Sequence, residues 1–233
     1  MKIVSMVILA LVLCTQILAQ KEDREQKIAA ILDLRSQISV LEKEILQPAA
    51  RDIEIAEKQG CSAIRILPRE KYDRVLAISG GGAYYSFFNK THEYGHGNDL
   101  ELQQGNFSVG FAGADYGFLK DLGEVALGNV DKETTEIAAL LKYVPPADEP
   151  SIRAEAQKLW KGYEINGISF TSRVPAVAGH SFLLRSIDID NSDIAVVFSV
   201  LRKDADGSLI LFWKPIESFP KPTMQREKVA AIY

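Results

Sequence analysis

Between Lys21 and Gln47 the apolar residues recur at alternating spacings of three and four, with neither Gly nor Pro in the segment. The apolar positions are Ile31, Leu34, Ile38, Leu41 and Ile45. This pattern predicts a long N-terminal helix over residues 20–47 with a heptad seam along one side. The seam fits two arrangements: a coiled coil with a second copy of the chain, which would make a homodimer, or a helix that lies on its own domain.

Toward the C-terminus the apolar pattern changes to runs typical of β-strands. Asn166-Gly167 favours a two-residue hairpin turn, and three longer runs follow it at Phe182 to Ile189, Ile194 to Leu201 and Ser208 to Trp213. Loops rich in Asp separate these runs, so they predict a three-stranded antiparallel meander. Both alternating faces of the last two runs are largely apolar. The meander should therefore be covered on both sides, by helices or by a second sheet.

Shorter β-type runs precede the meander, at Arg74 to Ile78, Ala83 to Phe88, Leu100 to Gln103 and Phe107 to Phe111. Gln104-Gly105-Asn106 joins the last two as a hairpin signal. Two helices are expected between the groups of strands, one capped by Asp131 and one starting near Pro150. The fold class expected is α+β, with an antiparallel β-sheet core, packed helices and the long N-terminal helix.

The first nineteen residues have the form of a secretory signal peptide: a charge at Lys2, an apolar run from Ile3 to Leu13, and Ala19 at a cleavage position. We therefore expect a secreted or periplasmic protein. Lipoprotein anchoring through Cys14 is not expected, because Leu13 is bulkier than the residue that normally precedes a lipidated cysteine. The apolar run is too short to span a bilayer and no second one follows, so no transmembrane segment is expected after signal removal.

The composition of the chain limits the kinds of molecule that it is expected to bind and the way in which it is stabilised. The formal net charge of −4 argues against a nucleic-acid partner. Removal of residues 1–19 would leave Cys61 as the only cysteine, so residues 48–233 should form a single globular domain stabilised by a hydrophobic core without a disulfide.

The segment from Ser79 to Leu119 contains more than half of the chain's 16 glycines and two of its three histidines. Aromatic residues are also concentrated there, and on an extended strand neighbouring rings point to opposite faces, so one face could present rings to a ligand. The expected ligand-binding surface consists of Tyr84, Tyr85, Phe87, Phe88 and Tyr94. The main hypothesis is a non-catalytic binding or interaction module for a carbohydrate or a peptide, without a cofactor.

The same segment contains HEYGH at residues 92–96, which matches the zinc-hydrolase pattern H-E-x-x-H. The alternative hypothesis is therefore a zinc-dependent metallohydrolase, with His92, His96 and His180 as ligands and Glu93 as the catalytic base. This reading needs the motif on a helix, where the two histidines of the motif share a face. Gly95 inside the motif and the turn sequence after it disfavour a helix. On a strand the two histidines would lie roughly 13 Å apart, too far to share a metal.

Overall fold

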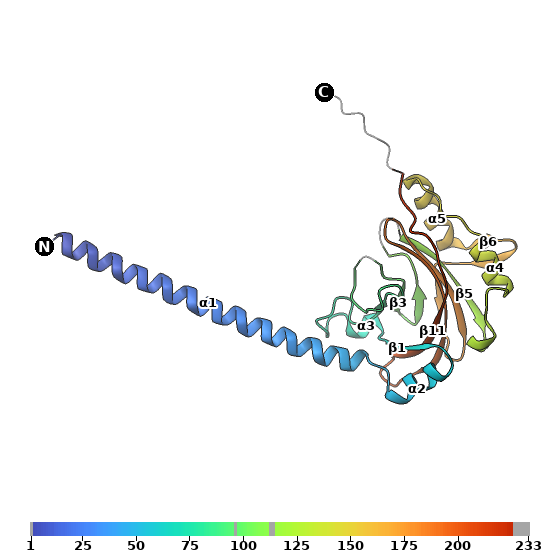
Figure 1. The fold of residues 1–233 in the computed structure, drawn as a ribbon, viewed down its shortest axis with the longest axis horizontal. Helices are drawn as coiled ribbons and strands as arrows, with labels where there is room; N and C mark the ends of the chain where they lie inside the picture. The colour runs from blue at the N-terminus through green and yellow to red at the C-terminus, as the bar shows by residue number, and fades with distance from the viewer. Residues whose placement is uncertain (1, 96, 112–114, 226–233) are drawn as a thin grey trace, which may run out of the picture. The chain divides into compact units, whose positions relative to one another are not determined.

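The computed structural model describes residues 2–95, 97–111 and 115–225 (Figure 1). The chain divides into two compact units, Met1–Ile45 and Leu46–Tyr233. The fold class predicted from the sequence, α+β with antiparallel sheets and a long N-terminal helix, is confirmed. No helix in the part of the chain that the structure describes is long and apolar enough to cross a membrane.

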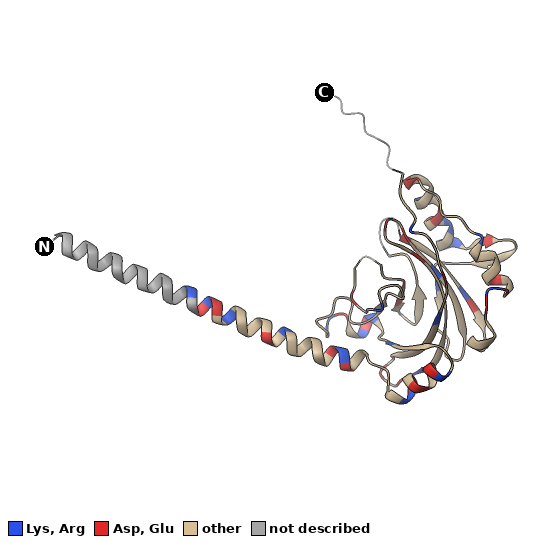
Figure 2. Cartoon of the chain, in the orientation of Figure 1, with Lys and Arg blue, Asp and Glu red and all other residues tan. Residues whose placement is uncertain are grey.

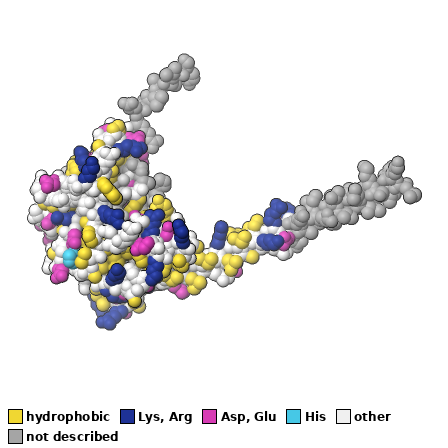
Figure 3. All heavy atoms as spheres, turned by 180° about the vertical axis from the view of Figure 1, so that it is seen from behind, with side chains coloured by type: hydrophobic (Ala, Val, Ile, Leu, Met, Phe, Trp, Pro, Cys, Tyr) yellow, Lys and Arg dark blue, Asp and Glu magenta, His cyan; other side chains and the backbone are white. Residues whose placement is uncertain are grey.

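The first unit consists of the helix α1 (Lys2–Leu46). Its described part carries positive and negative residues next to one another (Figure 2) and a series of exposed apolar side chains (Figure 3). The exposed fractions of these apolar side chains lie between 39% and 59%; they are Ile28, Ile31, Leu32, Leu34, Ile38, Val40, Leu41 and Ile45. The predicted seam residues all belong to this series.

The second unit is built on a five-stranded antiparallel sheet with the strand order β1-β11-β10-β9-β5. The strands are β1 (Ser62–Ile66), β5 (Asp115–Gly123), β9 (Ser181–Asp188), β10 (Ser192–Lys203) and β11 (Leu209–Ser218). Strands β9, β10 and β11 are the predicted meander. The three strands lie at the predicted positions because long apolar runs alternate with polar turns in this part of the sequence.

A second, four-stranded antiparallel sheet has the order β2-β3-β4-β8, with β2 (Tyr84–Tyr85), β3 (Leu100–Gln103), β4 (Asn106–Ser108) and β8 (Arg173–Pro175). The predicted hairpin between β3 and β4 is confirmed, with positive φ at both turn residues, 50° at Gln104 and 70° at Gly105.

The prediction of a strand at Arg74 to Ile78 is wrong. That run follows the short helix α3 (Arg69–Tyr72) as turns and bends, and its Val75 side chain is exposed, so burial does not select an extended conformation there.

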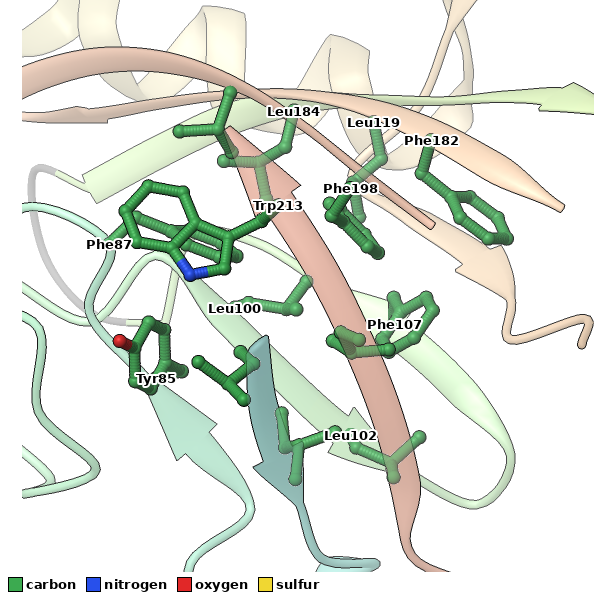
Figure 4. Close-up of a cluster of buried hydrophobic side chains, with 14 of the residues drawn as sticks. Tyr85, Phe87, Leu100, Leu102, Phe107, Leu119, Phe182, Leu184, Phe198 and Trp213 are labelled. Carbon is green, nitrogen blue, oxygen red and sulfur yellow. The ribbon is translucent and has the colours of Figure 1, made fainter. Parts of the chain in front are cut away.

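The main hydrophobic core lies between the two sheets (Figure 4). Phe198 is at its centre, with its ring centroid 5.1 Å from that of Phe107 and 5.2 Å from that of Phe182. Phe87 packs on Trp213 with a centroid distance of 4.9 Å. Aromatic rings from both sheets thus pack against one another and hold the four-stranded sheet against the five-stranded sheet.

The other face of the five-stranded sheet is covered by α4 (Thr135–Leu141), α5 (Glu149–Lys161) and the hairpin of β6 (Tyr163–Ile165) and β7 (Ile168–Phe170), as Figure 1 shows. The meander is therefore covered on both sides, by a sheet and by helices. The remaining helices are α2 (Ala50–Lys58) and the 3-10 turn η1 (Leu127–Asn129).

The two predicted helix starts differ in outcome. The helix α5 begins as expected, since Asp148 accepts a hydrogen bond from the Ser151 amide and Pro150 lies in the first turn. The helix α4 begins at Thr135, four residues after Asp131. The Asp131 carboxylate instead accepts hydrogen bonds from the amides of Glu133 and Thr134, which closes a turn ahead of the helix.

Candidate ligand-binding pocket

The outward face of the four-stranded sheet carries a polar row that crosses all four strands. Tyr84 pairs with Glu101, Glu101 with Ser108, and Ser108 with Arg173 in the strand register. Residues that pair across a sheet share a face, and their neighbours along each strand point the other way. Those neighbours, such as Leu102, belong to the core between the sheets. The row therefore lies on the face turned away from the core.

Glu101 is the centre of this row and is only 5% exposed. Its carboxylate accepts hydrogen bonds from Arg69 Nη1 at 2.8 Å and from Ser108 Oγ at 3.1 Å, and Glu101 lies opposite Tyr84 in the strand register. Burial acts to lower the pKa of Arg69, but the hydrogen bond to Glu101 and nearby negative charges outweigh it and raise the pKa. Arg69 and Glu101 thus form an ion pair within the row.

Aromatic rings surround the row and form the walls of a cavity of about 450 Å³. The Tyr84 ring lies 4.6 Å from that of Tyr94 and 5.4 Å, edge on, from that of Phe111. Trp160, from α5, lines the same cavity and is 68% exposed, while Tyr94 is 46% exposed. An apolar side chain as large as Trp160 loses free energy by facing water, so its position beside a polar cavity favours contact with a ligand.

The β8 end of the cavity contains two polar groups without protein partners. Arg173 is half-buried, and its guanidinium makes no hydrogen bond or ion pair with the residues that the structure describes. The hydroxyl of its neighbour Ser172 is buried and has no partner there either. Buried polar groups are normally paired, so both are candidates for ligand contacts.

Asp115 also lines the cavity and belongs to a group of acids at its back. It pairs with Asp188 in the register between β5 and β9. Burial, followed by its hydrogen bond to Asp188, raises the pKa of Asp115 to about 8. Burial likewise raises the pKa of Asp99 to about 6, although Asp99 accepts hydrogen bonds from the amides of Phe87 and Phe88. Asp115 and Asp99 therefore hold their protons more tightly than exposed aspartates do.

The aromatic residues expected to form a binding surface separate into three locations. Tyr84 and Tyr94 line the cavity. Tyr85 and Phe87 are 6% and 1% exposed and pack in the core, as Figure 4 shows, so they present no ring to a ligand. Phe88 is exposed on a turn outside the cavity lining. The expected strand from Ala83 to Phe88 ends early, and this turn separates Phe88 from Tyr84.

Several residues of the pocket were not singled out from the sequence: Arg69, Glu101, Trp160 and Arg173. They come from four segments that are far apart in the chain. The alternation in Leu100 to Gln103 places Glu101 opposite the apolar residues of β3, which is the one local signal for its side of the sheet. Their convergence depends on strand register and on the position of α5.

The HEYGH stretch has no helix between His92 and Gly95, and His96 lies outside the described residues. His92 Nδ1 lies 2.9 Å from the carbonyl oxygen of Tyr84, and burial lowers the pKa of His92 to about 4 against the opposing effect of its hydrogen bonds. His92 is therefore a neutral ring that donates to the backbone of β2. Glu93 is exposed.

His180 makes its own contact, with Nδ1 2.9 Å from Asp121 Oδ2. Among the described residues, no three His, Cys, Asp or Glu side chains are grouped so that they could hold a metal ion. The described donors thus do not fit the zinc site that the alternative hypothesis requires.

Comparisons with protein-family models, with curated proteins and with solved structures find no match to this chain.

Proposed function

We propose that this chain is an exported, non-catalytic binding protein whose ligand is a saccharide held in the pocket on the outward face of the four-stranded sheet. One observation carries the proposal. The polar row of Tyr84, Glu101, Ser108 and Arg173 lies beside the exposed ring of Trp160 in a single cavity.

This combination suits a sugar because a pyranose ring has both an apolar C–H face and a rim of hydroxyls. Rings such as Trp160 and Tyr94 offer flat apolar surfaces to the C–H face. The oxygens and N–H groups of the polar row offer directional hydrogen bonds to the hydroxyls.

A peptide fits this site less well. Peptides that bind to sheets usually add a strand to an exposed edge. The edge strands of the four-stranded sheet, β2 and β8, are two and three residues long, which is too short for a ladder of several hydrogen bonds. The rings also line the face of the sheet and not its edge.

Binding without catalysis is favoured by the state of Glu101. Its carboxylate already accepts hydrogen bonds from Arg69 and Ser108 and is paired in charge with Arg69. A general base needs a carboxylate that is free to take a proton, whereas an engaged carboxylate is suited to position hydroxyls.

The test of this proposal is the substitution Trp160→Ala. We expect binding of the preferred saccharide to weaken about ten-fold or more, because loss of a central aromatic contact commonly costs about 2 kcal/mol. The protein would first be screened on immobilised cellulose, xylan, chitin, pectin and alginate, and the affinity for a soluble fragment of the best ligand measured by calorimetry.

Val144→Ala is the matched control, since Val144 is a highly exposed apolar residue outside the cavity lining. It should leave the affinity unchanged. Retention by none of the polysaccharides, or equal affinities for the wild type and Trp160→Ala, would contradict the proposal.

We also infer that α1 associates with α1 of a second copy through the seam of Ile31, Leu34, Ile38, Leu41 and Ile45. The exposure of these side chains supports this inference, because apolar stripes at heptad spacing are buried when two helices pair.

Ile38→Glu should convert a dimer of the mature chain to a monomer in light scattering. Ser36→Glu, on the opposite side of the helix, should leave the mass unchanged. A wild-type chain that is already monomeric at high concentration would overturn the inference.

A further inference from the structure

We infer that the saccharide is acidic and that Arg173 binds the carboxylate of a hexuronic acid unit at the β8 end of the pocket. This inference rests on the proposed saccharide-binding function and names the class of sugar.

The two arginines of the pocket differ in what they already bind. Arg69 Nη1 donates to Glu101 at 2.8 Å, and the Arg69 guanidinium lies 5.6 Å from the centre of the Tyr84 ring. Arg173 lies at the other end of the polar row, and its guanidinium has no partner among the described residues. Its planar fork matches a carboxylate, which it can hold through two parallel hydrogen bonds.

Glu101 does not compete for Arg173. Between them stands Ser108, whose hydroxyl donates to Glu101 at 3.1 Å. Arg173 and Glu101 are two strands apart, which corresponds to roughly 10 Å. The positive charge of Arg173 is therefore left for a ligand, while the hydroxyl-binding end of the row lies at Glu101 and Tyr84.

An unpaired positive group lies at the β8 end of the cavity. The charged residues that line the cavity, among those described, are Arg69, Arg173, Glu101 and Asp115. Arg69 forms an ion pair with Glu101, whereas the guanidinium of Arg173 forms no ion pair with the described residues. Burial and the neighbouring Asp188 raise the pKa of Asp115, so this carboxyl holds its proton more tightly than an exposed aspartate does. An anionic group placed at Arg173 would therefore meet a positive charge that no described carboxylate neutralises.

Ser172 supplies a second polar contact at the same end. Its buried hydroxyl has no partner among the described residues, and it precedes Arg173 in the chain. A hydroxyl in that state gains a hydrogen bond when a ligand oxygen approaches, whereas a purely apolar ligand would leave it unpaired.

The experiment compares each acidic sugar with its own neutral form. Oligogalacturonate and oligoalginate would each be measured by calorimetry beside their methyl esters, which keep the ring and lose the charge. We expect at least one acid to bind about ten-fold or more tightly than its ester, because hydrogen bonds between charged groups are stronger than those between neutral groups. Arg173→Gln should remove this preference, so that the acid binds no more tightly than its ester.

Two further variants serve as controls. Arg173→Lys keeps the positive charge but lacks the planar guanidinium. It should bind the acid with an affinity between those of the wild type and Arg173→Gln. Arg153→Gln removes an exposed arginine of α5 that pairs with Glu149 outside the pocket and should change nothing. Thermal melting of each variant would establish that it is folded.

The outcomes separate the inference from the function that it rests on. Two results would overturn the inference that the sugar is acidic and leave saccharide binding in place. One is equal affinity for acid and ester; the other is an Arg173→Gln variant whose affinities for acid and ester fall by the same factor. A protein that binds neither form of either sugar, but binds a neutral polysaccharide in a manner sensitive to Trp160→Ala, would also overturn the acidic sugar alone. Binding to no saccharide at all would overturn both.

Discussion

Replacing Arg185 by methionine is expected to lower the free energy of unfolding by about 3–5 kcal/mol. Arg185 lies on β9, is 1% exposed, and donates to the Asp193 carboxylate through Nε at 2.9 Å and through Nη2 at 2.8 Å. Its Nη1 donates to the carbonyls of Leu140 and Tyr143, both at 2.9 Å. Methionine fills much of the volume but leaves the buried Asp193 carboxylate and both carbonyls without their donor.

The loss would be measured by urea unfolding followed by circular dichroism. Arg153→Met is the control, because the exposed ion pair of Arg153 with Glu149 should contribute no more than about 0.5 kcal/mol. The double variant Arg185→Met, Asp193→Leu should regain much of the lost stability, since it removes both members of the buried pair. A loss below about 1 kcal/mol in the single variant would contradict the role assigned to Arg185.

Asp115→Asn is expected to make the stability of the folded state less dependent on pH below about 8. The pKa of Asp115 in the folded protein is about 8, against 3.8 for an ordinary aspartate, so the folded state binds the extra proton between these values. Stability from this group is therefore greatest at low pH and is lost as pH rises through about 8. Each pH unit in that range corresponds to about 1.4 kcal/mol for one proton.

The groups that set this pKa lie on two other segments. Asp188 of β9 is hydrogen-bonded to Asp115, and Asp99, just ahead of β3, adds its charge. Asn191 Nδ2 donates a hydrogen bond to Asp188 Oδ2 at 2.7 Å. Asparagine at position 115 can still donate to Asp188 and has no proton to lose.

The measurement is the free energy of unfolding in urea at pH 6, 7 and 8. We expect the wild type to lose stability over this range with a slope near 1 kcal/mol per pH unit, and Asp115→Asn to lose most of that slope. Glu164→Gln, at an exposed position of β6, should retain the wild-type slope. Identical slopes for the wild type and Asp115→Asn would show that Asp115 is ionised at neutral pH.

Elements whose cause is local were predictable from the sequence. The three meander strands follow from long apolar runs between polar turns, and the β3–β4 hairpin follows from Gln104-Gly105. The run at Arg74 to Ile78 has the same local composition as a strand, but no neighbouring strand buries it. A β-type run becomes a strand only where another segment supplies hydrogen bonds and a covered face.

The candidate site was predictable only as a region. Of the seventeen described residues that line the cavity, eleven lie between Ser79 and Leu119, including Tyr84 and Tyr94. The aromatic run after Gly82 does not reveal that Tyr85 and Phe87 are buried while Tyr84 faces the pocket. Which of these rings are buried depends on which side of the strand packs on the five-stranded sheet. No single residue of the run determines that side.

By itself, the sequence determined the class of the fold, the meander, the hairpin turns and the region in which the pocket lies, because periodicity and turn residues act over a few neighbouring positions. Only the tertiary structure decided that Arg69, Glu101, Arg173 and Trp160 line one cavity and that Asp115 meets Asp188. Cross-strand register and helix placement join residues far apart in the chain, and the charge that a buried carboxyl carries depends on the partner it meets there.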